Sequence, residues 1–147
     1  EFLQAIVMKH GPSLTSLTLD DAYLEDSLAA GVAERCRNLQ ELSIIGCKGI
    51  LGSGLSSFSR HCTGLRKLKV SLRLVVGESY GKVLINPFCL LQVGGGVWSD
   101  SALCGFKDLH SLSIVRRNSL EDHCLLDLLQ GCPDLEVLKL GGCAALT

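Results

Sequence analysis

The stretch that decides the fold is "CRNLQELSIIGC", residues 36–47, in which aliphatic and polar residues alternate between two cysteines. One polar residue separates Leu42 from Ile44, a period of two that is typical of a strand with one buried face. The same arrangement returns near the end of the chain as "CPDLEVLKLGGC", residues 132–143. Two copies of so long a pattern indicate an internal repeat.

The repeat is marked by five segments with the pattern Leu-x-x-Leu-x-aliphatic. Their first leucines are Leu14, Leu39, Leu65, Leu109 and Leu135. Successive leucines are 25, 26, 44 and 26 residues apart, so three of the four intervals agree within one residue. The repeating unit is therefore about 25 residues long, with one irregular interval.

A second pattern lies between the strands and predicts helices. Three sets of apolar residues stand at positions i, i+3 and i+7, which is one face of a helix. The sets are Ala29, Val32 and Cys36; Leu55, Phe58 and Cys62; and Leu125, Leu128 and Cys132. Each unit is thus a strand followed by a helix. Stacked units share one core, with parallel strands on one side and helices on the other.

These units resemble the cysteine-containing leucine-rich repeat, C-x-x-L-x-x-L-x-L-x-x-C. Residues 36–47 and 132–143 match every position of that pattern, and Phe106 replaces the first cysteine ahead of Leu109. The resemblance covers about 1–70 and 97–147. It implies an α/β leucine-rich-repeat solenoid, similar to ribonuclease-inhibitor-like horseshoes, with strands on the concave face and helices on the convex face.

We expect one array of about five repeats over residues 1–147. Neither end of the sequence shows the polar capping unit that solenoids use to stay soluble. The sequence therefore suggests a fragment, truncated at both ends, of a longer array.

Residues 70–92 interrupt the repeat. Deleting these 23 residues leaves a 21-residue unit, within the roughly 20–29 typical of this repeat, and moves Val93 to the place of Val70. We hypothesise that the segment is a retained intron translated in frame. The alternative is a true surface loop inserted in one repeat, which solenoids tolerate. Transcript sequences that always include the segment would exclude the intron.

The composition excludes several classes of function. The chain has 147 residues, enough for one core, and its 14 basic and 15 acidic residues give a net charge of −1. No overall attraction to nucleic acid or to an anionic membrane follows from that balance. No apolar run reaches the roughly 18 residues of a membrane span. The sequence shows no signal segment, so we expect reduced cysteines and a location in the cytoplasm or nucleus.

The cysteines and histidines are the candidates for chemistry. No C-x-x-C or C-x-x-H occurs among the eight cysteines, so we interpret the Cys36–Cys47 pair as buried packing, with a metal site or a disulfide as alternatives. Cys62 and Cys124 each follow a histidine, which leaves a cysteine nucleophile as a further alternative. The "GESYGK" stretch (77–82) lacks the spacing of a phosphate-binding loop. We expect neither a cofactor nor enzymatic activity.

The outward residues of the strands remain as a binding surface. Alternation directs eight side chains inward, namely Leu17, Leu19, Leu42, Ile44, Leu112, Ile114, Leu138 and Leu140. Ser16 and Thr18 point outward together with the residues that we predict to bind a protein. That predicted set is Asp20, Glu41, Ser43, Ile45, Lys67, Lys69, Ser111, Ser113, Val115, Val137 and Lys139. Its mixture of aliphatic and polar side chains suits a protein partner.

Proteins that resemble this repeat subtype are often F-box proteins. In them the repeats hold a protein substrate, and a separate F-box docks to a cullin-type ubiquitin ligase. The resemblance implies that role in a plant-like or other eukaryotic cell, although no F-box lies within these residues. The alternative is a scaffold or immune-receptor array with the same fold and no link to ubiquitin.

Overall fold

The computed structural model describes residues 2–47, 49–50, 52–71, 105–115 and 122–141. Its strands are β1 (Ser16–Asp20), β2 (Glu41–Ile45), β3 (Lys67–Ser71), β4 (Ser111–Val115) and β5 (Val137–Gly141). Its helices are α1 (Phe2–His10), the short 3-10 helix η1 (Gly11–Ser13), α2 (Asp26–Arg35), α3 (Gly52–His61) and α5 (Asp122–Gly131). All five predicted leucine segments form strands.

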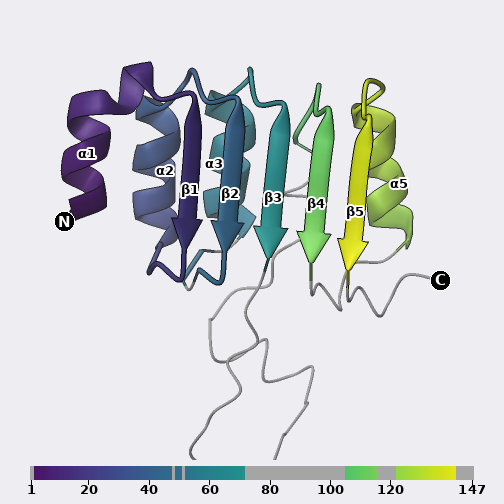
Figure 1. The fold of residues 1–147 in the computed structure, drawn as a ribbon, viewed down its shortest axis with the longest axis horizontal. Helices are drawn as coiled ribbons and strands as arrows, with labels where there is room; N and C mark the ends of the chain where they lie inside the picture. Colours follow the sequence, from purple (N-terminus) through teal and green to yellow (C-terminus); the bar gives the residue numbers. More distant parts are fainter. Residues whose placement is uncertain (1, 48, 51, 72–104, 116–121, 142–147) are drawn as a thin grey trace, which may run out of the picture.

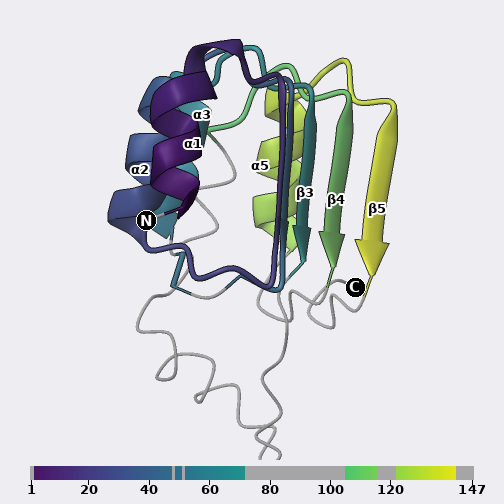
Figure 2. The ribbon, with the colours of Figure 1, turned by 60° about the vertical axis from the view of Figure 1, so that its left-hand side comes forward.

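The strands form one parallel sheet whose spatial order follows the sequence from β1 to β5 (Figure 1). The described helices all lie on one side of this sheet, so no described helix covers the other side (Figure 2). We call this helix-free side the open face. The predicted α/β arrangement, with parallel strands in one layer and helices in the other, is confirmed.

Equivalent positions of successive repeats pair with one another across the sheet. Leu42 pairs with Leu17 on one side and Leu68 on the other, and the row continues to Leu112. Leu42, Leu68 and Leu112 are buried. A second row contains Ile44, Val70 and Ile114, which are buried as well. The alternation seen in the sequence therefore separates the core from the open face, as predicted.

Backbone hydrogen bonds join the repeats just before each strand. The carbonyl of Thr15 accepts hydrogen bonds from the N–H groups of Gln40 and Glu41, at 2.8 and 3.0 Å. Gln40, Arg66 and His110 use their own carbonyls in the same way toward the next repeat. A repeating bond of this kind holds neighbouring strands in register, which fixes which side chains face outward together.

The helices form where the i, i+3, i+7 pattern predicts them. Ala29 and Val32 of α2 and Phe58 of α3 are buried against the sheet. The charges at the ends of α2 also suit its dipole, with Asp26 in the first turn and Arg35 in the last. The last helix, α5, ends at Gly131, two residues before Pro133, because the residue before a proline disfavours the helical conformation.

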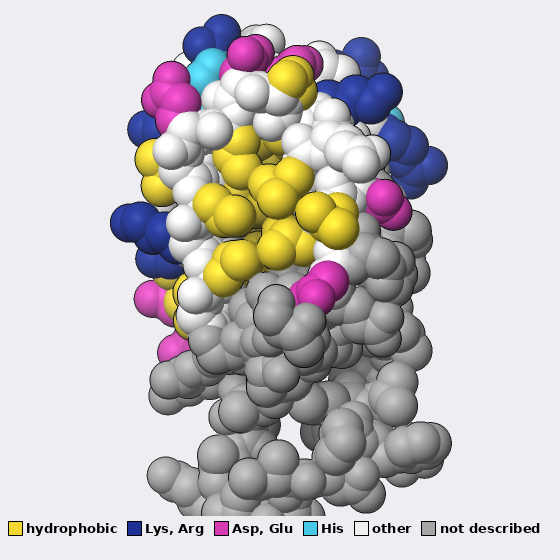
Figure 3. All heavy atoms as spheres, turned by 90° about the vertical axis from the view of Figure 1, so that its right-hand side faces the viewer, with side chains coloured by type: hydrophobic (Ala, Val, Ile, Leu, Met, Phe, Trp, Pro, Cys, Tyr) yellow, Lys and Arg dark blue, Asp and Glu magenta, His cyan; other side chains and the backbone are white. Residues whose placement is uncertain are grey.

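The β5 end of the described sheet shows an apolar patch (Figure 3). Leu138 and Leu140 lie in the same rows as buried residues of β4, yet they are 41% and 37% exposed. Their expected burial is not seen among the described residues, because β5 has a described neighbour on one side only. Leu17 in β1, at the opposite edge, is half-buried for the same reason.

The predicted insertion at residues 70–92 overlaps the described structure at its first two residues. Val70 and Ser71 complete β3, and Val70 is buried between Ile44 and Ile114. Residues 72–104 lie outside the described residues. The choice between a retained intron and a surface loop therefore stays a prediction.

Candidate protein-binding surface

The open face consists of three rows of side chains, because the strands are parallel and in register. From β1 to β5 the first row is Ser16, Glu41, Lys67, Ser111 and Val137; the middle row is Thr18, Ser43, Lys69, Ser113 and Lys139; and the last row is Asp20, Ile45, Ser71, Val115 and Gly141. The first two rows are mostly hydroxyls and charges. The last row adds the aliphatic side chains of Ile45 and Val115.

A shallow hollow gathers much of the predicted binding set. Its lining includes seven of the eleven predicted residues, namely Glu41, Ser43, Lys67, Lys69, Ser111, Ser113 and Lys139. Ser16 and Thr18 line it too, with Leu42 and Leu68 contributing from the core rows. The hollow thus spans side chains from all five strands, although these residues are far apart in the sequence.

The other four predicted residues do not line the hollow. Asp20, Ile45, Val115 and Val137 occupy the open face at its last row and its β5 edge. Sequence reasoning missed Ser71, which stands in the last row between Ile45 and Val115. Continuing the alternation of β3 by one residue finds Ser71, but the repeat spacing places it in the predicted insertion at residues 70–92.

Only one of the three lysines that line the hollow forms an ion pair within the described residues. The Nζ atom of Lys67 lies 2.6 Å from Oε1 of Glu41, its neighbour in the first row. Both side chains are about half exposed, so this ion pair adds little to stability, on the order of 0–1 kcal/mol. Lys69 and Lys139 have no ion-pair partner within the described part of the chain. The middle row therefore carries the unneutralised positive charge.

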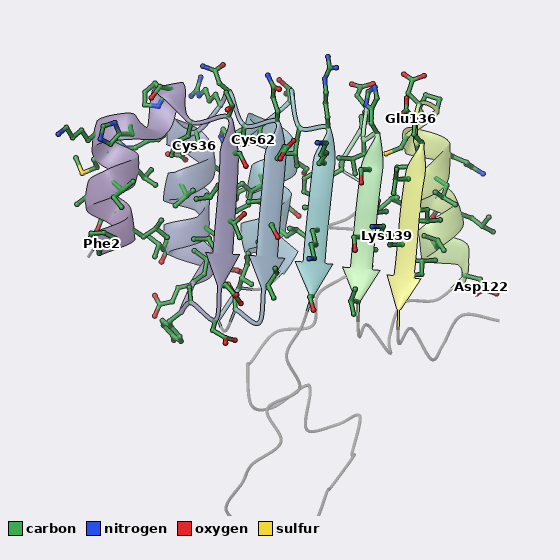
Figure 4. All side chains as sticks on the ribbon, viewed as in Figure 1. Phe2, Cys36, Cys62, Asp122, Glu136 and Lys139 are labelled. Atoms are coloured by element: carbon green, nitrogen blue, oxygen red, sulfur yellow. The ribbon has the colours of Figure 1, made fainter. Side chains whose placement is uncertain are left out.

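The described cysteines lie in the core, away from the open face. Cys36, Cys47, Cys62 and Cys132 are buried and unbonded to one another. The thiol of Cys62 donates to the carbonyl of Cys36, 3.3 Å away in the preceding repeat, and Figure 4 shows the two side by side (Figure 4). The predicted role in packing is confirmed for these four residues. A buried thiol that also donates a hydrogen bond to a carbonyl of the preceding repeat, as Cys62 does, links two repeats.

The described residues show no arrangement of side chains that supports metal binding or cysteine catalysis. Within these ranges, no group of three or more His, Cys, Asp or Glu side chains could hold a metal ion. Nδ1 of His61 lies 2.9 Å from the carbonyl of Ser57, in the turn that precedes it. The neighbouring Cys62 thiol instead points to the Cys36 carbonyl. The side chains of His123 and Cys124 lie outside the described residues.

Burial also lowers the reactivity expected of the Cys62 thiol. Loss of water around the buried sulfur raises the pKa of Cys62 from 9.0 to about 12, with a smaller contribution from Cys36. Since the thiolate is the reactive form, a rise of this size lowers its population about a thousandfold near neutral pH.

Iodoacetamide should therefore modify Cys62 far more slowly in the native protein than in guanidinium, as followed by mass spectrometry. Equally fast modification in both conditions would contradict the buried position.

The length and composition of the described helices bear on whether they could cross a membrane. Among the helices in the described ranges, none has both the length and the apolar character needed to cross a bilayer. The longest of them have ten residues.

The described fold is a stack of strand–helix units, the arrangement that the resemblance to leucine-rich repeats implies. Its described strands are parallel and pair at equivalent repeat positions, and one face of the sheet is left open. No protein-family model matches the sequence.

Two curated proteins are distantly similar to the chain. It is 29% identical over 145 residues to "F-box protein SKIP1" of Arabidopsis thaliana, an alignment that covers 99% of this chain and 45% of that protein. It is 28% identical over 148 aligned residues to "F-box/LRR-repeat protein 4" of Bos taurus, covering 92% of this chain and 23% of that protein. The chain thus spans less than half the length of either relative. These similarities confirm the resemblance to F-box/LRR-repeat proteins.

Proposed function

We propose that this chain is the substrate-recognition array of an F-box-type subunit of a cullin ubiquitin ligase. A protein partner binds on the open face, in and around the hollow that crosses the five strands. The observation that carries this proposal is the register of the sheet, which gathers seven predicted binding residues into one surface. The distant similarity to proteins named for an F-box supports the link to ubiquitin.

The chemistry of the open face supports binding to a protein. Its side chains are hydroxyls, amines, carboxylates and a few aliphatic groups, and its three rows contain neither cysteine nor histidine. Aliphatic groups such as Ile45 and Val115 beside polar ones match the usual anatomy of a protein interface. Among the side chains that the structure describes, the cysteines are buried and the histidines lie in helices or loops.

The experiment uses the full-length protein, reconstituted with the cullin ligase, and follows ubiquitylation of the bound partner. Ser113→Arg places a long side chain in the middle of the hollow, whereas Gln130→Arg places the same side chain on an exposed position of α5. We expect Ser113→Arg to abolish ubiquitylation of the partner while assembly with the cullin is retained. Gln130→Arg should behave as the wild type.

Two results would contradict the proposal in different ways. If the full-length protein does not assemble with a cullin, the chain is a scaffold or receptor array and the ubiquitin role is wrong. If assembly and ubiquitylation survive Ser113→Arg, the partner binds somewhere other than the open face.

A further inference from the structure

We propose that the middle row of the open face binds an extended acidic segment of the partner protein. This inference rests on the proposed function and adds the chemical class of the ligand. The residues that carry it are Lys69 on β3 and Lys139 on β5, with Ser113 between them on β4. Figure 4 shows Lys139 on the open side of β5 (Figure 4).

The two lysines are available for a ligand. Lys67, the third lysine of the hollow, already faces Glu41 at 2.6 Å. Lys69 and Lys139 are exposed and line the same hollow without an ion-pair partner in the described part of the chain. Asp20 lies on β1, two strands from Lys69, and Glu136 precedes β5 at its upper end in Figure 4. The positive charge is therefore concentrated over β3 to β5.

Unused hydroxyl groups continue the row beyond the lysines. Ser113 stands between the two lysine positions of the row, and Ser43 and Thr18 extend the line toward β1. Within the described residues none of these three hydroxyls has a side-chain hydrogen bond. They can donate to carboxylate oxygens or to backbone carbonyls of a bound segment.

The spacing of the row suits an extended chain that crosses the strands. Neighbouring strands lie about 4.8 Å apart, so the backbones at Lys69 and Lys139 are separated by about 10 Å. A polyproline II segment has three residues per turn and rises about 3.1 Å per residue, so residues i and i+3 lie on one side about 9 Å apart. Two acidic residues at this spacing would each face one lysine.

The composition of the face favours a carboxylate-bearing peptide over a phosphate-rich ligand. None of its three rows contains an arginine, the residue whose guanidinium group binds phosphate through two parallel hydrogen bonds. Two free lysines are too few to follow a nucleic-acid backbone. Ile45 and Val115 lie in the adjacent row and can contact aliphatic side chains of the same peptide.

The test measures binding of a fluorescein-labelled peptide to the full-length protein by fluorescence anisotropy. The probe carries Asp-Pro-Ala-Asp flanked by leucines, and the comparison peptide carries Asn-Pro-Ala-Asn in the same frame. We expect the acidic peptide to bind more tightly and to weaken as salt is raised. Lys69→Glu and Lys139→Glu should each weaken it by about tenfold, since reversal replaces attraction with repulsion.

A matched charge reversal separates the site from overall charge. Lys9→Glu on α1 changes the net charge equally but lies on the helix side of the sheet, so it should leave binding unchanged. Lys69→Arg should retain binding. Equal affinity for the two peptides, or an equal loss with Lys9→Glu and Lys69→Glu, would overturn the inference. Displacement of the peptide by inorganic phosphate, at an ionic strength at which sodium chloride leaves the peptide bound, would also overturn it by showing a site for any anion.

The failure of this inference differs from the failure of the proposed function. If the acidic peptide does not bind but Ser113→Arg still blocks ubiquitylation of the partner, the ligand class is wrong and the recognition role stands. If the peptide binds in the middle row and the full-length protein does not assemble with a cullin, the ligand class stands and the ubiquitin role is wrong.

Discussion

Leu42→Ala should lower the free energy of unfolding by about 2–5 kcal/mol, the range for truncation of a buried leucine. Leu42 is 1% exposed and lies between Leu17 and Leu68 in the central core row. Its truncation leaves a cavity between two neighbouring repeats, and stacked repeats depend on such contacts between neighbours. Denaturation in urea, followed by circular dichroism, measures the change.

Ser43→Ala is the matched control for this prediction. Ser43 is the next residue of β2, and it faces the open side of the sheet. Its replacement should change the free energy of unfolding by less than about 0.5 kcal/mol, as surface substitutions usually do. Comparable losses from the two variants would contradict the assignment of inward and outward positions.

Gly54→Ala should destabilise the protein by about 1–3 kcal/mol, the usual cost of overfilling a packed site. A methyl group at Gly54 would lie 3.1 Å from the Cβ of Ala29 on α2 and 3.1 Å from the Cγ1 of Ile50. It would also lie 2.5 Å from Oδ1 of Asp26, which accepts a hydrogen bond from Ser53 through its other oxygen. Alanine has the better helix propensity by about 1 kcal/mol, so the expected loss is opposite in sign to what propensity predicts.

Gly31→Ala supplies the control, because it makes the same change in a helix with free space around it. Gly31 is exposed on α2, and apart from its chain neighbours and the nearby backbone of its own helix, a methyl group there would meet no atom within 4 Å. This variant should gain about 0.5–1 kcal/mol through the reduced entropy of the unfolded chain. Thermal or urea unfolding of both variants gives the comparison. A gain in stability for Gly54→Ala would contradict the close approach of α2 and α3.

Much of the fold follows from the repeat because each strand carries its own period-two pattern. Leu42, Ile44, Leu112 and Ile114 are buried where that pattern predicts, and the pairing of equivalent positions follows from the common length of the units. The burial of Cys36 and Cys62 could be predicted in the same way. These features depend on local spacing, which a sequence displays directly.

Other features depend on what lies beside a residue, and local spacing does not encode that. Leu138 occupies a core position by its pattern, but its burial requires a covered neighbouring side. The contact at Gly54 depends on how closely α3 approaches α2, and glycine alone does not predict it. The place of Ser71 in the third strand could not be predicted, because the irregular 44-residue interval does not show where that strand ends.

The central claim is that the open face recognises the partner protein, and partner ubiquitylation by the Ser113→Arg variant tests it most directly. The full-length variant is compared with Gln130→Arg in the reconstituted cullin ligase. The account predicts that Ser113→Arg assembles normally but leaves the partner unmodified, while Gln130→Arg modifies it at the wild-type rate. Equal rates for the two variants would contradict it.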